Sequence, residues 1–190
     1  MKLRKHQREI LEYYRKTTRD CEYVKDVIMH VTPGGGKSLV PKIAFHILKE
    51  ANYVDKLLWV VPRKNLRTQG CLDLSREDRI IGIDGKISYQ IYESTNEIDP
   101  SRGTDGYITT YQALSMDQIG LNALEIERKR YLVVLDEVHH VELDGKLHKA
   151  LQPIMEHAQA KILMTGTLER GDKKPIAFIP YTEGRGSYAL

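Results

Sequence analysis

The stretch that decides the fold is His30-Val31-Thr32-Pro33-Gly34-Gly35-Gly36-Lys37-Ser38. An apolar run over 27–31 leads into the glycines, and a segment of helical apolar period follows to about residue 52. A strand, a glycine-rich turn and a helix form the context in which such a loop binds phosphate. Glycine lacks a Cβ, so backbone N–H groups can close around phosphate oxygens, and the helix start adds a positive dipole end. The stretch 32–38 is therefore predicted to bind a nucleoside triphosphate.

Two polar residues of this loop are expected to handle the phosphates. Lys37 would reach the β- and γ-phosphates, and the Ser38 hydroxyl would hold Mg²⁺. A turn that only links a strand to a helix is the alternative, but it leaves the Lys-Ser pair at the helix start without a purpose. Two features depart from the usual pattern. Val31 stands where the general G-x-x-x-x-G-K-[ST] loop has glycine, and Pro41 inside the next helix is expected to remove a backbone bond and kink it.

The composition is that of a globular protein. The 190 residues suit one domain with a substantial core, and 41% of them are hydrophobic and 29% charged. No apolar run approaches the roughly 20 residues that span a bilayer, and the basic start of the chain leads into no apolar signal segment. Cys21 and Cys71 are too few for a disulfide framework, although a bond between them stays open. A cytoplasmic protein is predicted, in the host cytoplasm if phage-encoded, without a membrane partner.

Apolar periodicity predicts strands that alternate with helices. The predicted strands are 27–31, 56–61, 79–84, 88–93, 107–110, 131–135, 161–164 and 176–179, and the predicted helices are 3–18, 39–52, 64–74 and 146–159, with another after residue 110. The polar stretch 94–106 is predicted to be an exposed loop, and the charged run 125–130 a solvated helix face. The alternation predicts an α/β fold, a mostly parallel sheet with helices on both faces. The domain is expected to span 1–181, with 182–190 a loose tail or the start of a linker.

Two adjacent carboxylates follow the clearest of the predicted strands, 131–135. Asp136 and Glu137 stand at its carboxyl end, where open α/β sheets bind ligands, so they are expected to face the same crevice as Lys37. Asp136 would complete the Mg²⁺ shell, directly or through water, because Mg²⁺ prefers oxygen ligands. Glu137 would orient or deprotonate the water that attacks the γ-phosphate. Lys37, Asp136 and Glu137 are therefore the predicted catalytic residues.

Two other interpretations of the acidic segment stay open. An acidic strand end can simply solvate a turn. The carboxylates could also hold a metal together with His139 and His140, although no Cys or His pair elsewhere completes a zinc pattern.

A short hydroxyl-bearing segment follows the next predicted strand. Thr165 and Thr167 flank Gly166, and their hydroxyls could hydrogen-bond the acidic motif and sense the state of the phosphates. A polar turn after a strand has the same composition.

In this order and on these strands, the phosphate loop 32–38, the acidic motif 136–139 and the segment 165–167 together resemble the first RecA-like domain of superfamily 2 helicases. Histidine in the fourth position of the acidic motif, His139, is typical of the DExH type. Helicase loops of this kind also tolerate an apolar residue at the position of Val31. Phage and bacterial DNA helicases and the motor subunits of restriction enzymes are the relatives that look most similar.

The resemblance implies roles for residues outside these three motifs. Gln7 looks like the residue that reads adenine through a bidentate amide contact, and Arg4 would help to cover the ring. The segments 60–64 and 108–114 look like motifs that contact the nucleic-acid backbone. The implied nucleic-acid contacts are Pro62, Arg63, Lys64, Thr109 and Thr110, and the implied coupling residues are His139, Thr165 and Thr167.

The family resemblance implies an ATP-dependent motor that moves on nucleic acid, with DNA favoured over RNA and with Mg²⁺ as cofactor. The family carries an arginine finger on a second RecA-like domain, expected elsewhere in the same parent chain, so this chain alone should bind Mg-nucleotide weakly and hydrolyse it poorly. One alternative is the motor subunit of a restriction or defence complex, which a nuclease or specificity domain would reveal. Another is a stand-alone P-loop nucleotide-binding module or small-molecule kinase, which would need a substrate pocket and a lid.

Overall fold

The computed structural model describes residues 2–24, 26–31, 36–168, 172 and 174–180. The predictions for Thr32, Pro33, Gly34 and Gly35 and for the tail 182–190 lie outside these residues. The strands are β1 (Val27–His30), β2 (Lys56–Val61), β3 (Ile91–Glu93), β4 (Gly106–Thr110), β5 (Tyr131–Asp136) and β6 (Ala160–Thr165). The helices are α1 (Lys5–Arg19), α2 (Leu39–Glu50), α3 (Lys64–Ser75), α4 (Tyr111–Ser115), α5 (Leu121–Arg128) and α6 (Lys146–His157), with a short 3₁₀ helix η1 (Val138–His140).

One sheet organises the described chain. Its six strands run in the order β1-β6-β5-β2-β4-β3, and every neighbouring pair is parallel. The predicted α/β fold with a mostly parallel sheet is therefore confirmed. The central strands β2 and β5 are continuous apolar runs, as expected where a parallel strand is covered on both faces.

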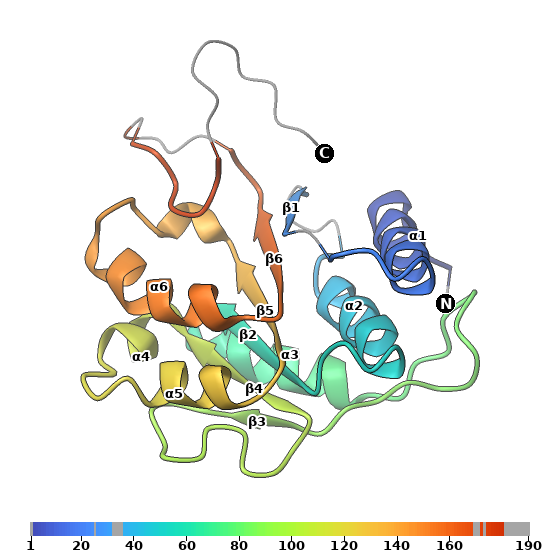
Figure 1. The fold of residues 1–190 in the computed structure, drawn as a ribbon, viewed down its shortest axis with the longest axis horizontal. Coiled ribbons are helices and arrows are strands. Elements are labelled where there is room, and N and C mark those ends of the chain that lie inside the picture. The colour runs from blue at the N-terminus through green and yellow to red at the C-terminus, as the bar shows by residue number, and fades with distance from the viewer. Residues whose placement is uncertain (1, 25, 32–35, 169–171, 173, 181–190) are drawn as a thin grey trace.

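Helices cover both faces of the sheet, as predicted. Side chains alternate between the faces along a strand, so Leu57, Trp59 and Val61 of β2 join the core under α1, α2 and α3. Leu58 and Val60 point the other way, into the core under α4, α5 and α6. Figure 1 shows α1 and α2 on one side of the sheet and α4, α5 and α6 on the other.

The strand order determines which loops meet. Parallel strands all end at the same edge of the sheet, and β1, β6, β5 and β2 are consecutive neighbours. The phosphate loop after β1, the Thr-Gly-Thr segment at the end of β6, the acidic motif at the end of β5 and the Pro-Arg-Lys segment after β2 are therefore placed side by side. Ligands of open α/β sheets bind at this edge.

Pro41 fits the helix better than expected. It is the third residue of α2, in the first turn, where N–H groups have no acceptor within the helix. Proline therefore removes no helical hydrogen bond there, and the expectation of a lost bond is wrong.

Two predicted strands are absent from the described chain. The segment 79–84 turns back on itself, with positive φ at Gly82 and at the following Gly85, and only a single antiparallel bridge flanks it. The segment 176–179 makes one bridge, from Ile176. Both predictions were wrong because Ile80, Ile83, Ile176 and Ile179 are buried in the cores without extended backbone pairing, whereas Ile81 is exposed.

Two predictions of exposure hold only in part, since 127–130 and much of 94–106 are exposed but some polar residues of both segments are buried. In the loop after β3, Ser94 and Ser101 are fully buried. In the charged run of α5, Glu125 is buried, and its Oε1 accepts from the Tyr131 hydroxyl at 2.6 Å and from Lys129 Nζ at 2.8 Å. A carboxylate with such partners can be buried, because hydrogen bonds replace those that water made. No helix in the described part of the chain has the length and apolar character needed to cross a bilayer.

Candidate nucleotide-binding and hydrolysis site

The end of the phosphate loop is held tightly against α1. Gly36 has a φ of +81°, and a Cβ on it would lie 2.9 Å from Nε2 of Gln7. Glycine is therefore needed here both for the left-handed backbone and for the close approach. Lys37 and Ser38 follow, with Ser38 exposed at the N-cap of α2.

The structure brings together two of the predicted catalytic residues. Lys37 Nζ forms an ion pair with Oε1 of Glu137, and the two side chains are only 11% and 22% exposed. A phosphate oxygen that accepts from Lys37 would compete with Glu137 for the same ammonium group. Their catalytic roles stay predictions, but their proximity is what the acidic motif was expected to produce.

Glu137 is held in a restricted geometry. Its φ of 52° and ψ of 51° are left-handed, a conformation that costs a non-glycine residue about 1–2 kcal/mol. This turn leads the chain from β5 into η1. Oε2 accepts from the backbone N–H of Gly166 at 3.0 Å. Burial raises the pKa of Glu137, but the Lys37 ammonium and the Gly166 N–H outweigh it and hold that pKa below its ordinary value. The carboxylate is therefore ionised near neutral pH.

Asp136 has the opposite electrostatics. Burial and the neighbouring charge of Glu137 raise the pKa of Asp136 to about 6, although Lys37 acts against the rise. Its Oδ1 is buried and has no hydrogen-bond partner among the described residues. An unpartnered carboxylate oxygen and the Ser38 hydroxyl are both oxygen donors of the kind that Mg²⁺ prefers, so these residues fit the ion. A bound cation would favour the charged form and lower this pKa.

Sequence reasoning missed the residue that holds the Asp136 backbone. The Tyr111 hydroxyl, from the start of α4, donates to the Asp136 carbonyl at 2.9 Å. Tyr111 is buried, so this bond lies under the acidic motif rather than in the open site. The segment 108–114 was interpreted only through its resemblance to a nucleic-acid motif, and nothing in the sequence links its tyrosine to β5.

The three predicted coupling residues form one hydrogen-bonded network with Glu137. His139 Nδ1 lies 3.0 Å from Thr165 Oγ1 and 3.4 Å from Glu137 Oε2. Thr165 Oγ1 also donates to the Thr167 carbonyl at 2.6 Å. Because Thr165 ends β6 and Glu137 follows β5, a change at the carboxylate can be passed directly to the neighbouring strand.

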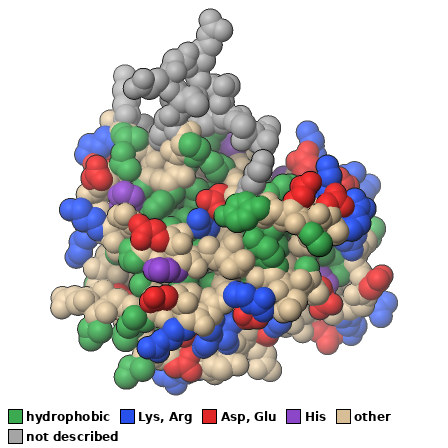
Figure 2. All heavy atoms as spheres, viewed as in Figure 1, with side chains coloured by type: hydrophobic (Ala, Val, Ile, Leu, Met, Phe, Trp, Pro, Cys, Tyr) green, Lys and Arg blue, Asp and Glu red, His purple; other side chains and the backbone are tan. Residues whose placement is uncertain are grey.

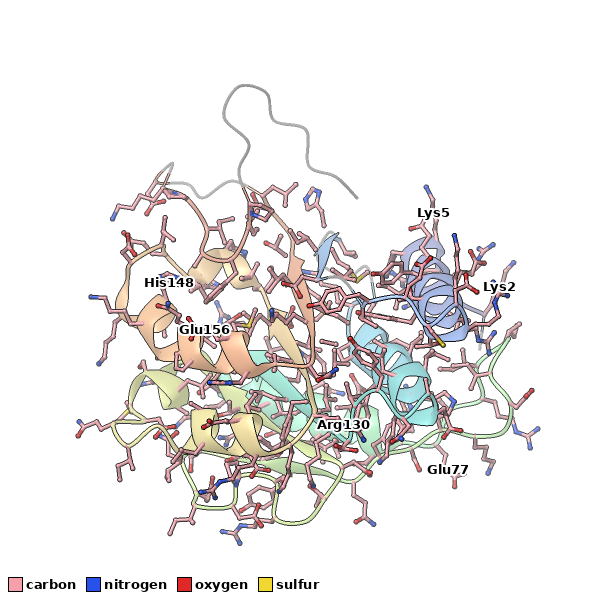
Figure 3. The ribbon with its side chains drawn as sticks, viewed as in Figure 1. Lys2, Lys5, Glu77, Arg130, His148 and Glu156 are labelled. Atoms are coloured by element: carbon pink, nitrogen blue, oxygen red, sulfur yellow. The ribbon has the colours of Figure 1, made fainter. Side chains whose placement is uncertain are left out.

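The predicted base-binding residues line a small hollow beside the phosphate loop. Its volume is about 190 Å³, and Lys2, labelled in Figure 3, lies on its rim. Gln7 donates from Nε2 to the Gly36 carbonyl at 2.8 Å and accepts at Oε1 from the Arg4 N–H at 2.9 Å. An amide nitrogen has two protons and an amide oxygen two lone pairs, so Gln7 keeps one donor and one acceptor for a base edge. The other lining residues are Arg4, Gly36, Ser38, Leu39, Asp73 and Arg76.

A larger hollow lies between Glu137 and two of the predicted nucleic-acid contacts, Pro62 and Arg63. It has a volume of about 430 Å³, and Pro62, Arg63, Asn65 and Leu66 form the wall that faces Glu137 and Gly166. Its remaining lining residues are His139, His140 and Thr167. Arg63 and Lys64 are both exposed at the start of α3. By contrast, Arg67, one turn further along α3, bonds Glu93 and the Ser94 carbonyl, each at 3.2 Å.

The two threonines of the other predicted nucleic-acid motif lie deeper than Arg63. Thr109 is fully buried, and Thr110, at 4% exposure, accepts at Oγ1 from the Ala113 N–H and so caps α4. Neither hydroxyl lies at the surface in this structure. The alternative metal site is not formed either. Among the described residues, no three His, Cys, Asp or Glu side chains lie together as metal ligands.

Two solved structures of similar fold contain DNA or a DNA substrate mimic. The chain is similar to the Sulfolobus solfataricus SWI2/SNF2 ATPase core in complex with dsDNA, with a TM-score of 0.65 and 18% identity over 90% of this chain and 34% of that one. It is similar to the Type ISP restriction-modification enzyme LlaGI in complex with a DNA substrate mimic, with a TM-score of 0.56 and 17% identity over 94% of this chain and 19% of that one. These similarities identify the fold as RecA-like.

Two curated relatives are informative. An uncharacterized protein of Mycobacterium leprae is 26% identical over 83% of this chain and 25% of its own length. A Mycoplasma pneumoniae protein, named for the C-terminal part of a type I restriction endonuclease subunit, is 28% identical over 75% of this chain and 71% of its own length. The chain thus spans about a quarter of the mycobacterial relatives that it matches.

A family model described as Type III restriction enzyme, res subunit, matches residues 1–170. Because the match spans most of the chain, this protein belongs to that family, whose members carry the superfamily 2 helicase N-terminal domain that its motifs resemble.

Proposed function

We propose that this chain is the ATP-binding half of a motor that couples Mg-ATP hydrolysis to movement on nucleic acid, with DNA favoured over RNA. One observation supports it above the others. Lys37, Glu137 and the segment 165–167 form one network that borders the same hollow as Arg63. A nucleotide-binding module without a motor role does not need its phosphate-binding lysine to be connected in this way to a predicted nucleic-acid contact.

The residues of the site divide the work of hydrolysis. Lys37 would bind the β- and γ-phosphates, with Ser38 and Asp136 holding Mg²⁺ between them. The ion would neutralise charge on the phosphate oxygens and help to orient them. Glu137, ionised at neutral pH, would orient the attacking water and accept its proton. A γ-phosphate in this position also draws Lys37 away from Glu137, which frees one carboxylate oxygen for the water.

The coupling step would follow from the same contacts. His139 lies between the Glu137 carboxylate and Thr165 and lines the same hollow as Arg63, so it would respond to a movement of that carboxylate. Arg63 and Lys64 would contact phosphates of the track without reading its sequence, so binding should weaken steeply with salt. The net charge is only +3, and basic and acidic side chains intermix over the face seen in Figure 2. A local contact near Arg63, rather than a broad basic field, is therefore the proposed track site.

A second RecA-like domain is part of the proposal. Arginine fingers are worth about 10³–10⁵ in rate in phosphoryl-transfer enzymes. Without one, the present 190 residues are expected to bind Mg-nucleotide weakly and to hydrolyse it slowly. Hydrolysis in the parent protein, in the cytoplasm, would then close and open the gap between the two domains.

A restriction complex is the second candidate setting. The family description and the Mycoplasma pneumoniae relative both name restriction enzymes. In that setting the motor would move DNA for a nuclease, and a nuclease or specificity domain in the parent protein would identify it.

ATP turnover by the parent protein tests the proposal. The assay compares buffer, single-stranded DNA, duplex DNA and RNA, with Lys37→Ala as the blank and Glu137→Gln as a variant that should still bind nucleotide. Strong stimulation by one polymer, absent in both variants, is the expected result and names the track. Turnover that no polymer changes would overturn the motor and favour a stand-alone nucleotide-binding module or kinase.

A further inference from the structure

The His30 side chain contacts Gly166, whose backbone N–H binds Glu137, although no motif assigns His30 a role. It is the last residue of β1 and stands two residues before the phosphate-loop position Thr32. Its Nε2 lies 3.1 Å from the carbonyl oxygen of Gly166. A carbonyl oxygen can only accept, so Nε2 carries the proton and donates it to this bond.

The contact continues the pairing of two strands past their ends. In the parallel register of β1 and β6, His30 stands beside Thr165, and the Val31 N–H donates to the Thr165 carbonyl at 3.0 Å. The His30 side chain supplies the next bond along β6, to Gly166. The end of β6 is therefore tied twice to the strand that enters the phosphate loop.

The other polar atom of Gly166 reaches the carboxylate that is proposed to orient water. The Gly166 N–H donates to Glu137 Oε2 at 3.0 Å, while its carbonyl accepts from His30. Glycine has no side chain to pack and adopts many backbone conformations. The direction of this N–H therefore depends on what holds the residue on either side, and the His30 bond is one of those restraints.

We propose that His30 is a positioning residue for Glu137, acting through the Gly166 backbone. The inference rests on the proposed hydrolytic role of Glu137. His30 makes no contact with phosphate in this account. It fixes Gly166, Gly166 fixes Oε2, and the other carboxylate oxygen remains available to Lys37 or to water. A shift of the phosphate-loop strand is transmitted along the same path to the carboxylate.

Two substitutions in the parent protein separate this role from simple packing. His30→Phe keeps a ring and removes the donor, whereas His30→Gln offers an amide N–H in place of Nε2. His30→Phe should lower kcat by about tenfold or more, by analogy with loss of a hydrogen-bond partner of a metal ligand, with less than about a threefold change in KM and in binding of a fluorescent ATP analogue. His30→Gln should recover most of kcat. His157→Phe, an exposed histidine of α6, is the matched control and should change none of these values.

A second measurement does not depend on turnover. Hydrogen exchange of the Gly166 amide, followed by NMR in this chain, should accelerate in His30→Phe and return toward the wild-type rate in His30→Gln. Equal kcat in His30→Phe and wild type, a His30→Gln variant as slow as His30→Phe, or unchanged Gly166 exchange would each overturn the inference. Absence of ATP turnover in the wild type would instead overturn the proposed function, and the Gly166 exchange rates would still decide whether His30 restrains this amide.

Discussion

Replacement of Asp78 by alanine should be the most destabilising of the charge-removing changes that this structure suggests. Lys42, in the second turn of α2, is 1% exposed, and its Nζ lies 2.6 Å from Oδ2 of Asp78, which is 9% exposed. Lys42 also donates to the carbonyls of Asp73 and Arg76, and Arg76 Nε donates to Oδ1 of Asp78 at 3.2 Å. All three protons of the buried ammonium group therefore have acceptors.

The magnitude follows from burial. At an effective dielectric constant of about 20, two unit charges at this separation attract by about 6 kcal/mol, and the loss of hydration offsets part of that attraction. Removing one partner of a buried pair leaves the other charge uncompensated and costs about 3–5 kcal/mol. We expect Asp78→Ala to lower the free energy of unfolding by that amount. Glu77→Ala is the matched control (Glu77 is labelled in Figure 3). The side chains of the Glu77–Lys86 pair are 61% and 53% exposed, and exposed pairs of this kind contribute about 0–1 kcal/mol.

Urea unfolding of the wild type and both variants measures this difference, provided the m-values agree. Burial raises the pKa of Asp78, but its bond to Lys42 and the charge of Lys42 outweigh that effect, so the folded-state pKa is below the ordinary value. The stabilisation is thus present above the unfolded pKa of about 4 and lost as the pH falls through the lower folded value. The gap between wild type and Asp78→Ala should stay constant from pH 8 to pH 5 and shrink only below about pH 4. A cost of Asp78→Ala within about 1 kcal/mol of Glu77→Ala would refute the reasoning.

Two further predictions concern the site itself. Gly36→Ala should weaken binding of a fluorescent ATP analogue by about tenfold or more, because it adds left-handed strain of about 1–2 kcal/mol and a Cβ 2.9 Å from Gln7 Nε2. Gly85→Ala, with a φ of +77° and nothing within 4 Å of the added Cβ, carries only the strain and should leave binding unchanged; equal effects of the two variants would contradict the clash. In a Mg²⁺-free NMR titration the Asp136 carboxyl should titrate near pH 6 and Glu137 below its ordinary value. Reversal of that order would contradict the assignment of Asp136 to the ion and Glu137 to the water.

The parts of the fold that the sequence predicted well are those whose signal is local. The run 56–61 is apolar without interruption because β2 is covered on both faces, and β5 gives the same signal. The glycine-rich loop and the acidic motif were also recognisable, since each is a short segment with one required chemistry. Their convergence followed from a general property of parallel sheets, in which the strands end at one edge.

The errors come from side-chain interactions that apolar periodicity does not reveal. Glu125 looks like a surface residue until Tyr131 and Lys129 are seen to pair with it. The segment 79–84 has strand-like apolar residues, but it pairs with no strand in the described part of the chain and folds as a turn. The hydroxyl of Tyr111, which follows β4, donates to the carbonyl of Asp136 at the end of β5, two strands away. The Tyr111–Asp136 bond joins residues 25 apart in the chain, and the partners of Glu125, although only four and six residues away, are not implied by apolar periodicity or motif spacing.

The contacts of Glu137 suggest how one bound phosphate could free one carboxylate oxygen for water while the other oxygen stays in place. Oε1 is bound by Lys37, whereas Oε2 is bound by the Gly166 N–H and lies 3.4 Å from His139 Nδ1. If Lys37 turns to a phosphate, the carboxylate loses its partner at Oε1 only, and Oε2 keeps the bond from the Gly166 N–H. A buried carboxylate released at both oxygens would be free to reorient and would favour protonation. Release at one oxygen would instead leave the carboxylate held at Oε2, with Oε1 open to water, and only when a phosphate holds Lys37.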